Sequence, residues 1–194
     1  ALNVASYQLA GCGTTTAALS FGGYTGAVVA TTEKWSGTAW ATTSNMNQAR
    51  GYLAGCGTTT DALSFGGDTS ASVATAEKFN NNAWATTSNL NQARSQLAGC
   101  GDVNNALSFG GSTGAYVATT ERWQFVNQEK VPAYDKGGYF TMSSWATTSN
   151  LNQARNALAG CGDVNNALSF GGITGASVAT TEKWSGSAWA TTSN

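Results

Sequence analysis

Four cysteines are the residues of this chain best suited to nucleophilic or metal chemistry, and they recur at fixed intervals. Cys12, Cys56, Cys100 and Cys161 are separated by 44, 44 and 61 residues. No histidine is present to act as their general base or co-ligand. Because they hold one position of a repeat, the spacing of the units should keep them beyond disulfide reach. We expect buried free thiols that pack as small hydrophobes, with a four-thiolate metal centre on a tight axis as the alternative.

Acidic and basic residues also recur instead of gathering at one place. Each unit has one glutamate at a fixed position, and three units have an arginine at another, whereas the first has Ser6 there. The glutamates are Glu33, Glu77, Glu121 and Glu182, and the arginines are Arg50, Arg94 and Arg155. No glycine-rich phosphate loop precedes a helical pattern. The sequence therefore favours a protein that is not an enzyme and has no cofactor.

Composition excludes several partners. Only 10% of the 194 residues are charged and the net charge is −1, so no basic stripe exists for a nucleic acid or an anionic membrane surface. No apolar run approaches the roughly 20 residues of a membrane span. Without an initiator Met or a signal peptide, the sequence favours a processed, excised or engineered segment.

A repeat of 44 residues organises the chain. The string LAGCG begins at Leu9, Leu53, Leu97 and Leu158, and the second tryptophan of each unit follows the same spacing apart from one insertion of 17 residues between Trp123 and Trp145. We expect a single domain, 1–194, of four units with approximate bounds 1–44, 45–88, 89–149 and 150–194. The third unit carries the insertion.

Each unit has the pattern of four short strands. In the second unit these are 53–57 (LAGCG), 62–67 (ALSFGG), 73–79 (VATAEKF) and 84–88 (WATTS). Thr and Val dominate between turns, a double glycine follows one strand, and NNNA is a four-residue hairpin turn. Helical apolar spacing does not occur. Four strands per repeat of this length predict an all-β chain of propeller blades.

The units resemble kelch repeats. Each has a hydrophobic strand that ends in Gly-Gly, as at Gly22 and Gly23, then a Glu-x-aromatic such as Glu33 with Trp35, a short hairpin and a second tryptophan. Three units end this pattern with Asn-x-Asn-Gln-Ala-Arg. Trp or Phe stands where the kelch pattern usually has Tyr. The units are rich in Thr, Ser, Gly and Asn, and in this they are also similar to kelch-like repeats of virion and environmental proteins. This similarity implies a virion-associated or extracellular location.

The resemblance implies a β-propeller whose recurrent glutamates and arginines form buried ion pairs that tie one blade edge to another. Such pairs fix register more than they add stability. Kelch rings usually have six or seven blades. Two copies that form an eight-bladed ring, a segment of a longer repeat chain and a closed four-bladed ring all remain open.

Residues that differ between units point to a binding face. The position after Gly-Gly carries Tyr24, Asp68, Ser112 and Ile173, and Tyr116 stands four residues after Ser112. Near the arginine position the varying residues include Tyr7, Tyr52 and Gln96. In a kelch-like blade both loops share one face, so we expect a polar, adaptable recognition surface for a protein or glycan. Neutral drift in loops is the alternative interpretation.

The insertion extends the hairpin between the third and fourth strands, on the face opposite the variable loops. Its aromatic residues include Phe125, Tyr134, Tyr139 and Phe140. Long connectors are usually functional or disordered, and this apolar content favours contact with a partner or a neighbouring subunit. The sequence therefore predicts a non-catalytic recognition or structural module. The alternative is a purely architectural or designed scaffold that forms homo-oligomers through the inserted hairpin.

Overall fold

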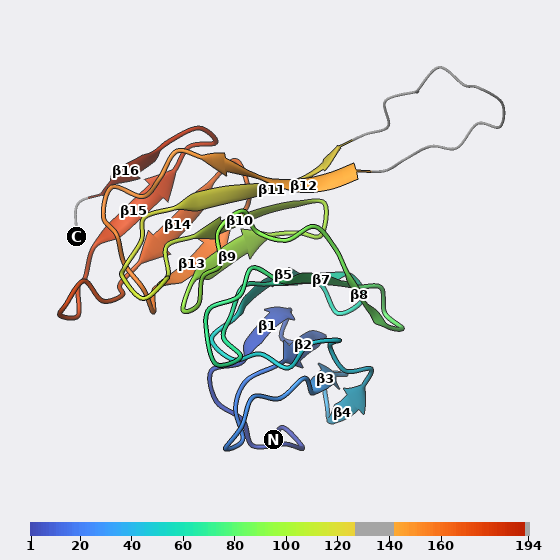
Figure 1. The fold of residues 1–194 in the computed structure, drawn as a ribbon. Coiled ribbons are helices and arrows are strands. Elements are labelled where there is room, and N and C mark those ends of the chain that lie inside the picture. Colours follow the sequence, from blue (N-terminus) through green and yellow to red (C-terminus); the bar gives the residue numbers. More distant parts are fainter. Residues whose placement is uncertain (127–141, 193–194) are drawn as a thin grey trace, which may run out of the picture.

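The structure, a computed structural model, describes residues 1–126 and 142–192. They form four antiparallel sheets of four strands each, stacked in chain order like a fan, with the first and last units at opposite ends (Figure 1). The prediction of an all-β chain of four-stranded repeats is confirmed. No helix long and apolar enough to cross a membrane occurs in these residues.

The strands of the four units have closely matching bounds. The first unit contains β1 (Ala10–Gly13), β2 (Ala18–Phe21), β3 (Thr32–Trp35) and β4 (Trp40–Thr43). The second contains β5 (Ala54–Gly57), β6 (Ala62–Phe65), β7 (Ala76–Phe79) and β8 (Trp84–Thr86). The third contains β9 (Ala98–Gly101), β10 (Asn105–Phe109), β11 (Thr120–Val126) and β12 (Met142–Thr148). The fourth contains β13 (Ala159–Gly162), β14 (Ala167–Phe170), β15 (Thr181–Trp184) and β16 (Trp189–Thr191).

The third strand of each unit begins later than the sequence predicts. β7 begins at Ala76, although the β-type pattern starts at residue 73. The carbonyls of Val73 and Ala74 accept hydrogen bonds from Arg94 N–H and Leu90 N–H of the segment that leads into the next unit. These two residues therefore join neighbouring units instead of extending their own sheet.

The double glycine makes this approach of neighbouring units possible. Gly66 has φ +64° and Gly67 φ +108°, values that favour glycine. A Cβ added to Gly66 would lie 2.7 Å from the carbonyl oxygen of Arg94 in the next unit. Any larger residue would push the units apart at this point.

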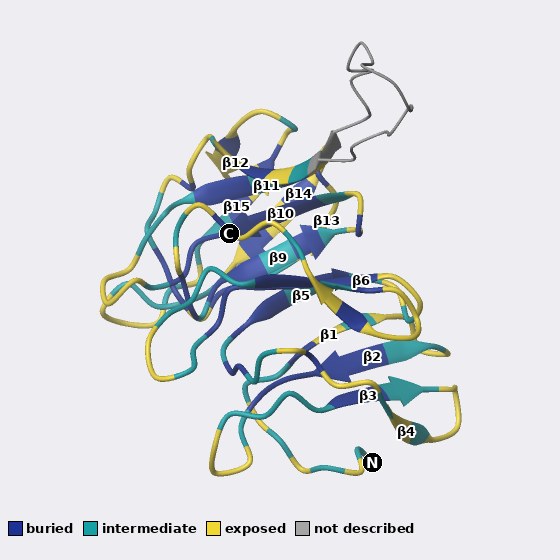
Figure 2. Cartoon of the chain, turned by 45° about the vertical axis from the view of Figure 1, so that its right-hand side comes forward, coloured by how far each residue is buried: buried dark blue, intermediate teal, exposed yellow. Residues whose placement is uncertain are grey.

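Aromatic side chains fill the space between units. The phenylalanine that ends a second strand meets the tryptophan of the next unit's fourth strand edge-on, as Phe21 meets Trp84 with ring centroids 5.0 Å apart. Phe65 meets Trp145 and Phe109 meets Trp189 in the same way, each at 4.9 Å. These rings lie in the main hydrophobic clusters, which Figure 2 shows as a buried band through the stacked sheets.

One of these tryptophans lacks a hydrogen bond that its equivalents have. Trp84 Nε1–H donates to Thr32 Oγ1 at 3.0 Å, and Trp189 Nε1–H donates to Thr120 Oγ1 at 3.1 Å. The equivalent acceptor for Trp145 would belong to residue 76, which is alanine. The buried indole N–H of Trp145 has no hydrogen-bond partner in the described chain.

Ala76→Thr is expected to raise the free energy of unfolding by about 1 kcal/mol, the usual net value of one hydrogen bond, because it supplies the missing acceptor. Urea unfolding followed by tryptophan fluorescence would measure the change. Ala76→Val is the matched control, because it adds similar volume without the hydroxyl group. Equal effects of the two substitutions would contradict this explanation.

The insertion begins as an extension of one hairpin. β11 and β12 have seven residues each, and their pairing continues past Trp123↔Trp145 to Phe125↔Ser143 and Val126↔Met142. The other units connect the corresponding strands by four residues, as 80–83 connect β7 and β8. Of the predicted contact residues, Tyr134, Tyr139 and Phe140 lie outside the described residues, whereas the backbone of Phe125 belongs to β11.

The four cysteines lie in the first strands, and neighbouring first strands lie side by side. All four are free thiols, but only Cys56 and Cys100 are buried. The prediction of four buried thiols is therefore wrong for Cys12, which is half-buried, and for Cys161, which is exposed. Cys161 is exposed because no further unit among the described residues covers it. Burial raises the pKa of Cys100 to about 12, so its thiol stays protonated at neutral pH.

Candidate functional site

The structure brings the variable residues together at one end of the sheets. In each unit, a short bridge joins the segment before the first strand to the loop after the second strand, as Tyr7 pairs with Tyr24. A second bridge closes that loop on itself, as Ser112 pairs with Tyr116. The remaining units repeat this arrangement with Gly51↔Asp68↔Ser72 and Asn156↔Ile173↔Ser177. We call the surface formed by residues 7–8, 24–28, 51–52, 68–72, 95–96, 112–116, 156–157 and 173–177 the loop face.

Three tyrosines form an aromatic cluster on the loop face. The rings of Tyr7 and Tyr24 are stacked with centroids 5.7 Å apart, and Tyr52 meets Tyr24 edge-on at 5.7 Å. Tyr24 Oη donates to Asp68 Oδ1 at 3.2 Å. Burial and the Asp68 carboxylate raise the pKa of Tyr24, so its hydroxyl remains a donor. Tyr7 is 56% exposed, which leaves an aromatic surface available for stacking.

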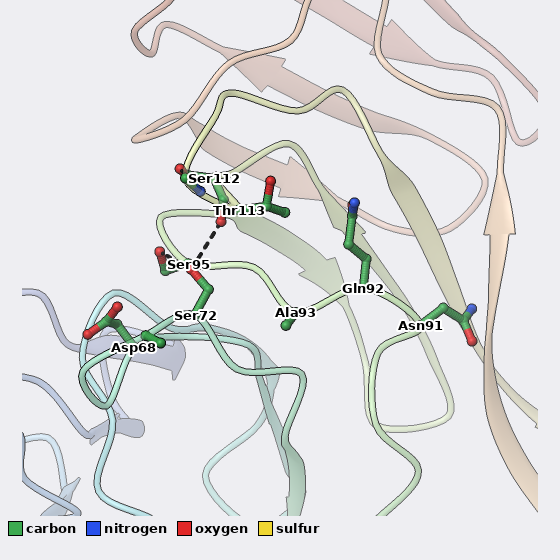
Figure 3. Close-up of a pocket in the computed structure, with 10 residues that line it drawn as sticks. Asp68, Ser72, Asn91, Gln92, Ala93, Ser95, Ser112 and Thr113 are labelled. Carbon is green, nitrogen blue, oxygen red and sulfur yellow. Dashed lines mark hydrogen bonds between the residues drawn. The ribbon is translucent and has the colours of Figure 1, made fainter.

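A hollow of about 800 Å³ lies beside this cluster, between the second and third units (Figure 3). Asp68 and Ser72 line it from the second unit, Ser112 from the third, and Ser95 from the connecting segment. Ser72 Oγ lies 3.0 Å from Ser95 Oγ and donates to Ser112 O at 3.2 Å. The hollow therefore has a carboxylate and several hydroxyl groups in its wall.

Comparing the sequences of the units did not identify two of the residues that line the hollow. Asn91 and Gln92 line the hollow next to Ala93, and Figure 3 shows them at the side away from Asp68. They belong to the Asn-x-Asn-Gln-Ala-Arg segment, which is shared by three units. Variation could not reveal them, but their position just before the varying Ser95 could have. The buried Oε1 of Gln92 has no partner in the described residues and can accept a hydrogen bond.

A second, smaller hollow of about 190 Å³ lies where all four units meet. Its wall repeats one pair per unit, namely Gln8 with Leu9, Tyr52 with Leu53, Gln96 with Leu97 and Ala157 with Leu158. The first member of each pair has a positive φ, between 50° and 56°, although none is glycine. The last three each donate their N–H to the carbonyl of the equivalent residue of the unit before, from Tyr52 to Gln8, Gln96 to Tyr52 and Ala157 to Gln96, at 2.9 Å each. This chain of hydrogen bonds holds the strained backbone in place.

The recurrent glutamates and arginines form three buried ion pairs. Arg50 Nη2 lies 3.0 Å from Glu77 Oε1, and the distances for Arg94 with Glu121 and for Arg155 with Glu182 are 2.9 Å. All six side chains are fully buried. Each pair joins the segment before the first strand to the third strand of the same unit. The resemblance to kelch repeats implied that these pairs tie one unit's edge to another. In the structure they instead join two segments of one unit.

Each guanidinium also reaches three neutral acceptors. Arg94 donates to Gly110 O at 2.7 Å, to Thr119 O at 2.9 Å and to Ser108 Oγ at 2.8 Å. Burial lowers the pKa of Arg94, and the Glu121 carboxylate offsets part of that shift. These arginines are enclosed by protein, so they do not present a ring of charge to a ligand carboxylate.

The first unit has the acceptors of this arrangement but not its arginine. Glu33 is 3% exposed and accepts Asn3 N–H at 2.8 Å and Val4 N–H at 2.9 Å. Ser6 occupies the position of the arginine. Glu33 consequently has no cationic partner among the described residues.

Ser6→Arg is expected to raise the free energy of unfolding by about 1 kcal/mol, because the new guanidinium gains the acceptors that Arg50, Arg94 and Arg155 use and desolvation offsets much of the gain. Thermal unfolding followed by circular dichroism would measure the shift. Ser6→Lys is the control, since one ammonium group cannot reach all four acceptors. A lysine variant at least as stable as the arginine variant would contradict the expected geometry.

The described residues contain no group of three or more His, Cys, Asp or Glu that could hold a metal ion. The loop face instead combines one carboxylate, several hydroxyl and amide groups and exposed aromatic rings, which are groups that bind a polar ligand by hydrogen bonds and stacking. Comparisons of the sequence with models of known protein families and with curated proteins found no match.

Proposed function

We propose that this chain is a non-catalytic, kelch-like β-propeller segment that recognises a polar, hydroxyl-rich ligand such as a glycan at its loop face. The observation that supports this most is the hollow of about 800 Å³ beside the tyrosine cluster. Asp68 belongs to both, because it lines the hollow and accepts from Tyr24. Residues that served only to hold the fold would not need to differ between units and to gather around one hollow.

The chemistry of the loop face favours a neutral, hydroxylated ligand over an ionic one. Asp68 supplies acceptors, and Ser95 and Ser112 line the same hollow. Tyr7 and Tyr116 are 56% and 41% exposed and can stack on an apolar ring face. The same groups suit a polar protein surface, so both ligand classes belong in one screen.

Binding to immobilised glycan and protein arrays tests the proposal. The wild-type chain is expected to bind at least one class of ligand. Asp68→Ala should weaken that binding about tenfold or more, because a hydrogen bond to a charged group contributes about 1.5–3 kcal/mol. Asp61→Ala is the matched control, since Asp61 is exposed in the same unit at the other end of the sheet. No binding to either array, or equal loss in both variants, would contradict the proposal.

An architectural role is the alternative, and the lengthened β11–β12 hairpin is the observation that favours it. In that case, deleting residues 125–141, which leaves residues 124 and 142–144 as a four-residue connection between Trp123 and Trp145, should abolish oligomers. An unchanged mass by light scattering would contradict this alternative.

A further inference from the structure

The three junctions between units are built from the same parts. The phenylalanine at the end of a second strand lies against a glycine in the first strand of the next unit and against a tryptophan in that unit's fourth strand. A Cβ added to Gly55, Gly99 or Gly160 would lie 2.4, 2.3 or 2.3 Å from Cζ of Phe21, Phe65 or Phe109. The phenylalanine therefore fills a slot that exists only because a glycine stands opposite.

Backbone hydrogen bonds repeat at each junction as well. Between the first two units, Gly23 N–H donates to Arg50 O at 2.8 Å, Met46 N–H to Ala30 O at 2.9 Å and Arg50 N–H to Val29 O at 3.3 Å. The other two junctions have the equivalent bonds within 0.1 Å of these lengths. The contact between units is thus one defined interface used three times.

The fourth unit carries the phenylalanine side of this interface, and no described residue of another unit packs against it. Phe170 is 40% exposed and Leu168 is 38% exposed. Their equivalents in the other three units are at most 1% exposed. The Gly172 N–H and the carbonyls of Val178 and Ala179 have no equivalent bonds among the described residues.

The first unit carries the other side of this interface, formed by the glycine and the tryptophan against which the phenylalanine packs at the other junctions. Trp40 contacts Trp35 of its own unit but, unlike Trp84, has no phenylalanine of a preceding unit against it in the described chain. Gly11 stands where the glycines of the slot stand, and an added Cβ there would meet only Leu19 of its own unit. Figure 1 shows the two end units at opposite ends of the stack.

We propose that the fourth unit of one copy of this chain packs against the first unit of a second copy, with Phe170 over Gly11 and against Trp40. The halves match because they are the two sides of an interface that the chain already forms three times within itself. Thr181, the equivalent of Thr32, would accept the indole N–H of Trp40. Two different surfaces meet, so the contact is heterologous and extends into a closed ring or a filament.

This assembly is independent of the proposed recognition function, because it uses sheet faces and not the loop face. Sedimentation velocity of the wild-type chain is expected to show a species larger than the monomer. Phe170→Glu should reduce this species to monomer, whereas Tyr116→Glu, at a similarly exposed position on the loop face, should leave it unchanged. A monomer at the highest soluble concentration would overturn the proposal.

Mixing two defective variants tests the head-to-tail direction. Phe170→Glu keeps an intact first unit and Trp40→Glu keeps an intact fourth unit, so each alone is expected to be monomeric. An equimolar mixture should form a one-to-one dimer through the remaining pair of intact faces. If the wild type assembles but the mixture stays monomeric, the contact joins like faces and the proposal is wrong.

Alkylation of Cys161 gives a reading that does not depend on those variants folding. Cys161 is exposed in the single chain, whereas its equivalents Cys56 and Cys100 are each 5% exposed beneath the following unit. Assembly should therefore slow the reaction of Cys161 with iodoacetamide as protein concentration rises, measured by peptide mass spectrometry. A rate that does not change with protein concentration would contradict the docked arrangement.

Discussion

Replacing Arg94 with methionine is expected to lower the free energy of unfolding by about 3–5 kcal/mol, because it leaves the carboxylate of Glu121 buried without its cation. The side chains of both residues are fully buried. The substitution also removes the donor to the carbonyls of Gly110 and Thr119. Urea unfolding followed by tryptophan fluorescence would measure the loss.

A double variant separates the lost charge balance from lost packing. Arg94→Met with Glu121→Gln removes the buried charge together with its partner and should recover part of the stability. Arg94→Lys should fall between wild type and Arg94→Met, because it keeps the charge but reaches fewer acceptors. A loss below about 1 kcal/mol for Arg94→Met would mean that the pair contributes no more than an exposed one.

Phe65→Ala is expected to cost about 3–5 kcal/mol, the usual range for removing a fully buried aromatic side chain. Phe65 is 0% exposed and packs against Trp145 of the next unit. Phe170→Ala changes the same residue type at the same position of the repeat, but Phe170 is 40% exposed.

The Phe170 variant therefore serves as the matched control for Phe65→Ala and should cost less than about 1 kcal/mol when measured on the monomer. Thermal and urea unfolding at low protein concentration would compare the two substitutions. Equal losses would contradict the conclusion that the contact between units, and not the phenylalanine's own sheet, provides the stabilisation.

The sequence predicted those features of the fold that depend on repetition. The 44-residue period, the four strands per unit and the four-residue turn at 80–83 all follow from spacing and turn residues. The insertion between Trp123 and Trp145 was correctly assigned to one hairpin. The seven-residue lengths of β11 and β12 could not be predicted, because the residues after Trp123 carry no clear turn signal until Pro132.

Features that depend on neighbouring units were harder to predict. The prediction that all four thiols are buried failed for Cys161, because the repeat pattern does not show whether anything covers the fourth unit. The positive φ values of Tyr52 and Ala157 were also invisible, since neither residue type favours that conformation. They arise from the hydrogen bonds that pass from unit to unit.

For the candidate site, variation between units predicted which positions converge but not the shape that they form. Asp68 and Ser112 come from different units and line one hollow. Asn91 and Gln92 complete it from a repeated segment. Variation between units gives little signal for positions that belong to a segment shared by three of the units, even where they lie in the same wall.

Hydrogen–deuterium exchange with and without a ligand identified on the arrays tests the central claim, that the loop face is the recognition surface, most directly. The account predicts slower exchange in residues 68–72, 91–95 and 112–116 on binding. It predicts no change in the hairpin turns 36–39, 80–83 and 185–188 at the other end of the sheets. Protection of those turns, with residues 68–72 and 112–116 unchanged, would contradict the claim.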